Sequence, residues 1–201
     1  FYDMYYDKTI KRVNVLNQSK SWNQLFSYDT VNINWTSYNN IKFFLDRIES
    51  FVQKLYDKND ITFIHWDFCL SNILYDTNNW IIKTIDPRGY FWELWVFWDH
   101  KYDIAKLRHS FVWFYDFIVS DLFKVNFDNK NKFELIIYND DNHKYISDFF
   151  DSVLNKYWYI DYVKFIEALL FLSMIPLHSD NIQRQYAMFC IAIQKLNEIH
   201  F

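Results

Sequence analysis

The sequence predicts an α+β domain that is mostly helical and carries a small β-hairpin near its middle. Apolar residues recur at helical spacing over long stretches of the chain, which is typical of helices packed on a core. Two short apolar runs, 72–75 and 81–85, flank the turn-forming segment Asp76-Thr77-Asn78-Asn79, which indicates the hairpin. Neither an internal repeat nor a low-complexity linker divides the 201 residues, a length that suits one domain.

The first half of the chain is expected to contain few long elements. Residues 1–38 are polar and irregular, and we expect loops and short helices there. Apolar positions at helical spacing predict an amphipathic helix over 39–57. A short buried strand is expected at 61–64, directly before the hairpin.

The second half is expected to be dominated by helices. Residues 102–123 are apolar on nearly all sides, which predicts the buried central helix of the domain. Residues 126–143 are charged and rich in Asn, so we expect a surface excursion with one strand at 135–137. Three further helices are expected over the ranges 145–157, 160–174 and 180–199.

Composition excludes two classes of partner. The net charge is −4 and no run of Lys or Arg occurs, so we expect no nucleic-acid surface. The longest apolar stretch, 168–177, is shorter than the ~20 residues that a membrane span needs, so we expect no membrane partner. Cys69 and Cys190 lie among apolar neighbours, which favours buried free thiols in a reducing compartment and a cytoplasmic protein.

One constellation around the hairpin carries chemistry. His65, Asp67 and Asn72 form the pattern HxDxxxxN, and Asp86 follows Asn72 across the hairpin. Phosphoryl transfer needs a group that orients the acceptor hydroxyl or takes its proton, which Asp67 supplies. Asn72 and Asp86 offer hard oxygen ligands for the Mg²⁺ that accompanies ATP. We expect His65 to brace this catalytic loop by hydrogen bonds.

These residues resemble the catalytic loop HGDxxxxN of the aminoglycoside phosphotransferase and choline kinase superfamily. The similarity is greatest to phosphotransferases encoded with bacterial capsule and lipopolysaccharide sugar genes. It covers about 61–194 and rests on four runs. These are HWDFCLSNILYD at 65–76, IDPRG at 85–89, YDIAKLRHS at 102–110 and LSMIPLHSD at 172–180.

The resemblance implies the C-terminal lobe of a protein-kinase-like fold, with ATP as co-substrate and Mg²⁺ as cofactor. Asp67 would be the catalytic residue, and Asn72 and Asp86 would hold the metal and the nucleotide. Asp103, at the start of the buried helix, would accept backbone hydrogen bonds from the catalytic loop. A helix N-cap is the alternative role for this residue, and the two are compatible. Arg88 would bind phosphate or acceptor, with a surface ion pair as the alternative.

The implied acceptor is a hydroxyl of a small molecule, a sugar or polyol of surface-polysaccharide metabolism. His109 and His178 would line the acceptor pocket, with a core or surface histidine as the alternative for each. The family's N-terminal lobe supplies a loop over the phosphates and a Lys. Because residues 1–60 contain no glycine, we expect 1–201 to be the C-terminal lobe alone. We then expect the missing lobe to lie upstream in the same full-length polypeptide, and the fragment to be inactive without it.

Two other functions compete with a kinase. A catalytically inactive binding module of the same fold is the alternative, because Trp66 stands where the family has Gly. A metal-dependent hydrolase using His65 and Asp67 lacks the further His or carboxylate ligands that such a site needs.

The tryptophans form a pattern of their own. The chain holds one glycine and nine tryptophans, whereas a chain of this length carries about 14 glycines at the usual frequency. Trp35 and Trp80 each follow Asn in a turn context, where Asn-Gly is the usual pair. The resembling family has glycine at four further positions, Trp92, Trp95, Trp98 and Trp113. We expect most of the nine to be glycines whose UGA codons were translated under the wrong code, and several of their indoles to be exposed or strained.

Overall fold

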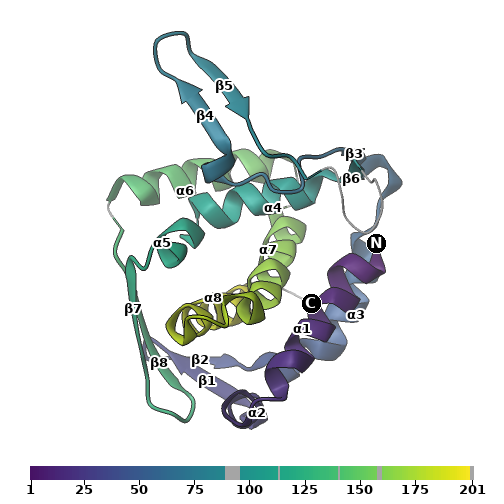
Figure 1. Cartoon of the computed structure of the whole chain (residues 1–201). Helices are drawn as coiled ribbons and strands as arrows, with labels where there is room; N and C mark the ends of the chain where they lie inside the picture. The colour runs from purple at the N-terminus through teal and green to yellow at the C-terminus, as the bar shows by residue number, and fades with distance from the viewer. Residues whose placement is uncertain (89–95, 113, 140, 158–159, 200–201) are drawn as a thin grey trace. The chain divides into compact units, whose positions relative to one another are not determined.

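The computed structural model describes residues 1–88, 96–112, 114–139, 141–157 and 160–199 (Figure 1). Within these ranges the protein is α+β and mostly helical, so the predicted coarse class is confirmed. The chain forms two compact units. The first unit comprises Phe1–Leu55, Phe117–Tyr138 and Lys164–Phe201, and the second comprises Tyr56–Asp116 and Asn139–Val163.

The first unit packs helices on a four-stranded sheet. A π-helical turn, Asp3–Asp7, leads into α1 (Lys8–Asn17), α2 (Lys20–Ser27) and α3 (Ile41–Leu55), and α8 (Ile182–Glu198) follows near the end of the chain. The sheet has the order β2-β1-β8-β7. Its strands are β1 (Thr30–Ile33), β2 (Thr36–Asn39), β7 (Phe123–Phe127) and β8 (Lys132–Ile137). The β1–β8 pair is parallel and the other two pairs are antiparallel.

Aromatic side chains hold this sheet and its helices together. Phe189 of α8 lies 5.5 Å from Trp22 of α2 and 5.7 Å from Phe133 of β8, measured between ring centroids. Phe189 is fully buried and Trp22 is 4% exposed. Burial of such large rings dominates the stability of a core.

The sheet of the first unit corrects two expectations. β1 and β2 lie in the segment that was expected to hold only loops and short helices, and 126–143 contributes to two strands instead of one. β1 presents only Val31 and Ile33 to the core, which is too short an alternation to stand out in the sequence. Its pairing with β8 joins residues about a hundred positions apart, at Asn32 and Lys132.

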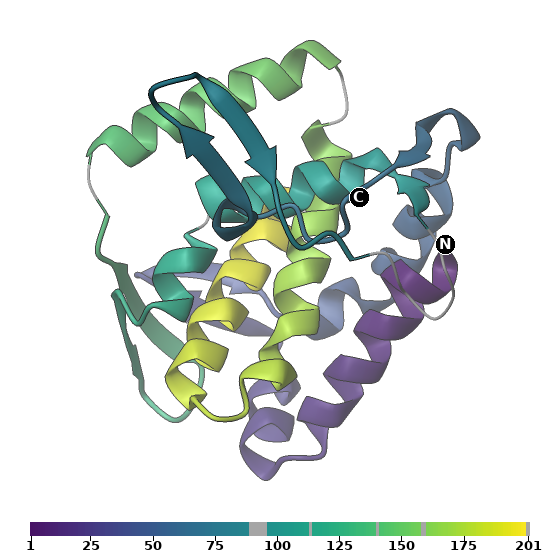
Figure 2. The ribbon, with the colours of Figure 1, turned by 45° about the horizontal axis from the view of Figure 1, so that its top comes forward.

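The second unit carries the predicted hairpin. β4 (Ile73–Asp76) and β5 (Ile81–Thr84) pair antiparallel and project away from α4 (His100–Phe111) (Figure 2). β3 (Ile61–Phe63) pairs with β6 (Phe97–Asp99). Helix α6 (Asp141–Leu154) also belongs to this unit. The boundaries between the units fall within α5 (Tyr115–Val119) and α7 (Ile160–Met174), and most of α7 belongs to the first unit.

Most of the predicted elements are confirmed, and the central helix is not. Helices α3, α6, α7 and α8 occur where the periodicity predicts them. Strand β3 also occurs where it was expected, but its three residues are exposed, so the expectation that it is buried is wrong. The helix expected over 102–123 ends at Phe111, resumes as the short α5, and gives way to strand β7 at Phe123. Phe114 and Asp121 have φ of 59° and 58°, in the left-handed region, which no right-handed helix can accommodate.

Three tryptophans adopt the backbone conformation that glycine prefers. Trp35, Trp66 and Trp80 have φ of 68°, 68° and 57°. The indoles of Trp35 and Trp80 are 91% and 80% exposed, whereas that of Trp66 is buried. The expectation of exposed indoles or strained backbones is therefore confirmed at these positions. Trp98 lies in strand β6 without positive φ, so this criterion does not extend to it.

Two further expectations concern burial and membranes. Cys69 and Cys190 are both free and buried, as predicted. No helix of the described ranges has the length and apolarity that crossing a bilayer requires. Trp92, Trp95 and Trp113 lie outside the described residues.

Replacing Trp35 by Gly should stabilise the protein. Asn34 and Trp35 form the two-residue turn between β1 and β2, and both have positive φ. A non-glycine residue in this region costs roughly 1–2 kcal/mol, and part of the relief is offset by glycine's greater freedom when unfolded. We expect a gain of about 1 kcal/mol, which raises Tm by about 2–4 °C for a chain of this size.

Trp22→Gly is the matched control for that measurement. It removes a buried indole from the interior of α2 and should lower stability by about 3–5 kcal/mol. Thermal unfolding of both variants checks the pair. A loss of stability in Trp35→Gly would show that the exposed indole at this turn has no backbone strain to relieve.

Candidate active site

The predicted catalytic loop is a tightly turned segment that follows strand β3. Ile64 leaves the strand with its N–H donated to the carbonyl of Val96 at 3.0 Å. The loop then turns on itself, because Cys69 N–H donates to the carbonyl of Asp67 at 2.9 Å and Asn72 N–H donates to the carbonyl of Cys69 at 3.0 Å. A single 3-10 turn, Leu70–Asn72, leads into the hairpin.

The side chain of Asp103 holds the start of this loop. Its two carboxylate oxygens accept the backbone N–H groups of His65 at 2.5 Å and Trp66 at 2.9 Å. This is the contact that the resemblance implies for Asp103. The alternative role as a helix cap is wrong, since Asp99 caps α4 by accepting the N–H of Lys101. Burial raises the pKa of Asp103 despite these donors.

Two backbone hydrogen bonds join the far end of the hairpin to the same loop. Ile85 N–H donates to the carbonyl of Asn72, and Arg88 N–H donates to the carbonyl of His65, both at 3.0 Å. Asp86 lies between these two bonds, so it belongs to the same pair of loops as Asp67 and Asn72. Its φ of 56° lies in the left-handed region, a conformation that Asp tolerates and that concentrates at functional sites.

The carboxylate of Asp67 is fixed on both of its sides. Lys106 Nζ lies 2.8 Å from Oδ1, and the side-chain amide of Asn72 lies 3.5 Å from Oδ2 and donates to the Asp67 carbonyl at 2.9 Å. Burial raises the pKa of Asp67, but the charge and hydrogen bond of Lys106, with the charges of Arg88 and His65, outweigh it. The pKa therefore lies below its ordinary value.

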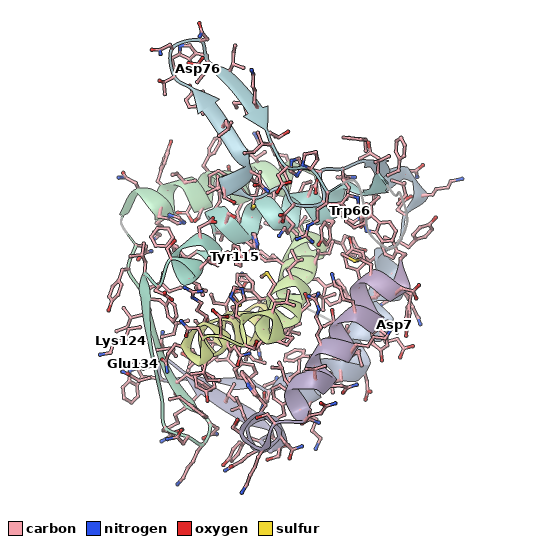
Figure 3. All side chains as sticks on the ribbon, viewed as in Figure 1. Asp7, Trp66, Asp76, Tyr115, Lys124 and Glu134 are labelled. Atoms are coloured by element: carbon pink, nitrogen blue, oxygen red, sulfur yellow. The ribbon has the colours of Figure 1, made fainter. Side chains whose placement is uncertain are left out.

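Lys106 is the residue of this site that the sequence analysis missed. It lies on α4 three positions after Asp103, and residues at this spacing share a helix face. The spacing was therefore the signal that could have found it. Figure 3 labels Trp66 of the loop and Tyr115 of α5, and Lys106 Nζ lies 6.0 Å from the ring centroid of Tyr115.

The remaining predicted residues have different environments. The expectation that His65 braces the loop is wrong for its side chain: neither ring nitrogen has a hydrogen-bond partner among the described residues, and the ring lies 5.7 Å from that of Phe68. Only the backbone of His65 bonds, to Asp103 and Arg88. Arg88 is exposed. His109 is fully buried and stacks on Tyr115 at 4.4 Å, and burial holds its pKa well below the ordinary value. His178 belongs to the first unit.

The donor set fits a magnesium ion that is bound together with phosphates. The described residues contain no group of three His, Cys, Asp or Glu side chains able to hold a metal by themselves. The side-chain amide of Asn72 donates its N–H to Asp67, which leaves the side-chain oxygen Oδ1 for a metal. The carboxylate of Asp86 is exposed. Mg²⁺ commonly takes only one or two protein oxygens and completes its shell with phosphates and water.

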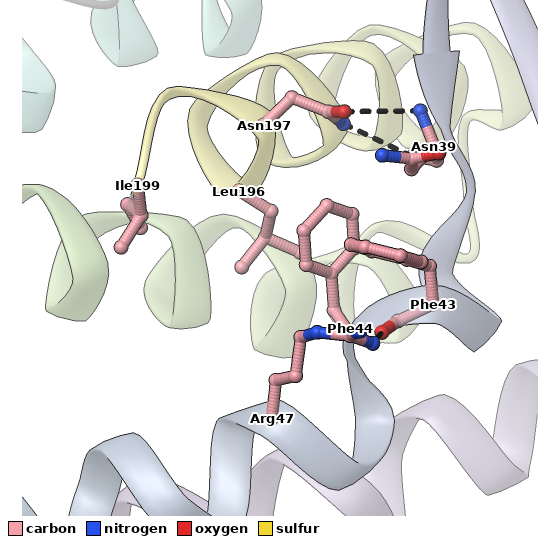
Figure 4. Close-up of a pocket in the computed structure, with 7 residues that line it drawn as sticks. All are labelled: Asn39, Phe43, Phe44, Arg47, Leu196, Asn197 and Ile199. Atoms are coloured by element: carbon pink, nitrogen blue, oxygen red, sulfur yellow. Dashed lines mark hydrogen bonds between the residues drawn. The ribbon is translucent and has the colours of Figure 1, made fainter. Parts of the chain in front are cut away.

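An open pocket lies elsewhere in the chain and contains none of these residues. It has a volume of about 400 Å³ and is lined by Asn39, Phe43, Phe44, Arg47, Leu196, Asn197 and Ile199 (Figure 4). Asn39 and Asn197 bond to each other across its rim, and the Arg47 guanidinium lies 3.7 Å from the Phe43 ring centroid. Its lining holds no carboxylate, so it lacks the groups that phosphoryl transfer requires.

No family model, no curated protein and no solved structure matches this chain. The superfamily therefore stays a prediction from the motifs.

Asp103→Asn should loosen the catalytic loop. An amide offers one oxygen where the carboxylate offers two, so one of the two backbone donors loses its acceptor. Hydrogen bonds to charged groups contribute about 1.5–3 kcal/mol, and we expect a stability loss of about 2 kcal/mol. Hydrogen exchange at the amides of His65 and Trp66 should accelerate, and Asp148→Asn on the exposed face of α6 is the control. Unchanged protection at both amides would contradict the proposed clamp.

Proposed function

We propose that the protein is an ATP-dependent phosphotransferase that acts on a hydroxyl of a small molecule. One observation supports this most: two backbone hydrogen bonds and the Asp103 carboxylate hold Asp67, Asn72 and Asp86 on one pair of loops. Phosphoryl transfer depends chiefly on such positioning and on charge, and little on covalent help from the protein. A sugar or polyol of surface-polysaccharide metabolism, and a cytoplasmic location, belong to this proposal through the motif resemblance.

The residues of the loops divide the work. Asp67 accepts a hydrogen bond from the acceptor hydroxyl and aligns its oxygen with the γ-phosphorus. As the new oxygen–phosphorus bond forms and the bond to the β-phosphate oxygen breaks, the hydroxyl proton passes to the Asp67 carboxylate. Lys106 lowers the pKa of this carboxylate and so makes it a weaker base. Mg²⁺ bound with ATP would neutralise the phosphate charge, with Asn72 and Asp86 as its protein ligands.

The second candidate function is a binding module without turnover. The buried indole of Trp66 favours it, because this side chain lies directly before Asp67 with its ring 5.4 Å from that of Trp98. A loop filled in this way has less room for close approach of a substrate. Intact Asp67, Asn72 and Asp86 favour the enzyme.

Asp67→Asn in the full-length polypeptide should lower turnover by orders of magnitude and leave the fold intact. The amide cannot take the hydroxyl proton, and proton transfer contributes about 10²–10⁴-fold. Release of ADP from Mg·ATP, with water and with a panel of sugars and polyols as acceptors, measures the effect. Near-normal turnover in this variant would reject the role of Asp67, and an absence of turnover in the unmodified protein would favour the binding module.

Asp86→Ala should weaken the magnesium-dependent part of nucleotide binding. Calorimetric titration with Mg·ADP and with ADP in excess chelator separates this part from the rest. Asp76→Asn is the control, because it removes a charge from the tip of the same hairpin and keeps the Oδ1 that accepts the N–H groups of Asn78 and Asn79 (Figure 3). Equal loss of affinity in both variants would indicate a general charge effect and would exclude a specific ligand at Asp86.

A further inference from the structure

The ammonium group of Lys106 is largely buried and forms an ion pair with one carboxylate, that of Asp67. The Lys106 side chain is 11% exposed and reaches Asp67 Oδ1 at 2.8 Å. A buried charge is costly unless it is paired, and the other nearby carboxylate, Asp103, already accepts two backbone N–H groups. In this arrangement both carboxylates have partners: Asp103 accepts the two N–H groups, and Asp67 pairs with Lys106.

The pairing makes the two oxygens of Asp67 different. Oδ1 is occupied by Lys106, whereas Oδ2 faces the Asn72 amide at a weak 3.5 Å. Since a carboxylate accepts along several lone-pair directions, Oδ2 keeps the capacity to bind a hydroxyl. It also lies on the side of Asn72, which offers a metal ligand.

Resting on the proposed phosphotransfer function, we propose that Lys106 is a positioning residue for the reaction. It holds Oδ1 so that Oδ2 receives the acceptor hydroxyl, and it offsets the negative charge of Asp67 next to the incoming phosphates. An uncompensated carboxylate there would repel the nucleotide. Lys106 thus acts through Asp67 and does not need to touch the substrate.

Lys106→Gln tests this role in the full-length polypeptide, because Gln keeps a donor for Asp67 and removes the charge. With water as acceptor, kcat for Mg·ATP hydrolysis should fall about 100-fold, the effect of a small misplacement. KM for Mg·ATP should rise, because the Asp67 charge is no longer offset. Lys106→Arg, which keeps the charge, should restore KM and recover part of kcat. If the Gln variant does not fold, Lys106→Arg carries the test, because it keeps the charge and changes only the geometry of the contact with Asp67; its kcat should then lie below that of the unmodified protein.

Lys101→Gln is the matched control for a purely structural ion pair. Lys101 lies on the same helix, is 2% exposed and pairs with Asp99 at 3.1 Å. This variant should lower Tm and leave kcat unchanged. Wild-type kcat in a folded Lys106 variant would overturn the Lys106 role alone. An unmodified protein that neither binds nor hydrolyses Mg·ATP would overturn the proposed function, and this inference with it.

The backbone carries a second and independent inference, about the identity of three residues. Of the five tryptophans in the described ranges, Trp35, Trp66 and Trp80 have positive φ. The chain also has 21 Phe and 16 Tyr. Among the Phe and Tyr residues that the structure describes, Phe114 alone has positive φ. Only a few per cent of non-glycine residues adopt this conformation, so aromatic content does not explain the pattern.

Each of the three positions has the local geometry that favours glycine. Asn34-Trp35 is a two-residue hairpin turn with φ of 48° and 68°, the conformation for which Asn-Gly is preferred. Trp80 ends the turn between β4 and β5, and Trp66 turns the backbone so that its N–H meets Asp103. Trp22, in contrast, is a helical residue packed among aromatic rings, as a true tryptophan would be.

We infer that positions 35, 66 and 80 are glycine in the protein made by the cell, with UGA codons there that the cell reads as glycine. At position 66 a glycine also removes the indole directly before Asp67. The functional loop then has the open backbone that close approach of a substrate requires.

Codon sequencing and peptide mass spectrometry of the protein from its source organism decide this second inference. We expect UGA at the three positions and peptides lighter by the difference between a tryptophan and a glycine residue. The peptide that contains Trp22 is the internal control, with UGG and an intact tryptophan. Tryptophan detected at positions 35, 66 and 80 would overturn the inference.

Discussion

The Asp103 carboxylate is the constraint on which the candidate site depends. It joins the first turn of α4 to the backbone of His65 and Trp66, and so fixes where the loop starts. The loop in turn holds Asn72, whose carbonyl receives the N–H of Ile85 and thereby orients the segment of Asp86. Helix α4 therefore sets the position of residues that lie on loops. A catalytic site needs such support, because its groups must be held in a fixed geometry.

The pKa values of the two acids next to α4, Asp103 and Asp67, are shifted in opposite directions. Burial raises the pKa of Asp103, whereas Lys106 brings the pKa of Asp67 below its ordinary value. Asp103 and Lys106 lie three residues apart on α4, so one helix face provides both the clamp and the counter-charge. A weakly basic Asp67 suits a reaction in which orientation of the hydroxyl matters more than early removal of its proton.

Local patterns in the sequence were enough to predict the hairpin, five other elements and the residues of the loop. They failed where distant segments pair, as in strands β1 and β8, because nothing near Asn32 indicates Lys132 as its partner. They also failed at Phe114 and Asp121, where left-handed residues interrupt a continuous apolar pattern. Lys106 was missed because a lysine on a helix with several charged residues matches no motif, although its spacing from Asp103 was present. The strained tryptophans were anticipated because turn chemistry is local.

Paramagnetic broadening by Mn²⁺ added with ADP tests the central claim most directly, because Mn²⁺ takes the oxygen ligands that Mg²⁺ takes. In the full-length protein, the account predicts that backbone amide signals of Asp67, Asn72 and Asp86 broaden first. Those of Asn39 and Arg47, at the separate pocket, should stay sharp. Broadening confined to that pocket, or equal broadening of exposed acidic residues throughout the chain, would contradict a metal–nucleotide site on the two loops.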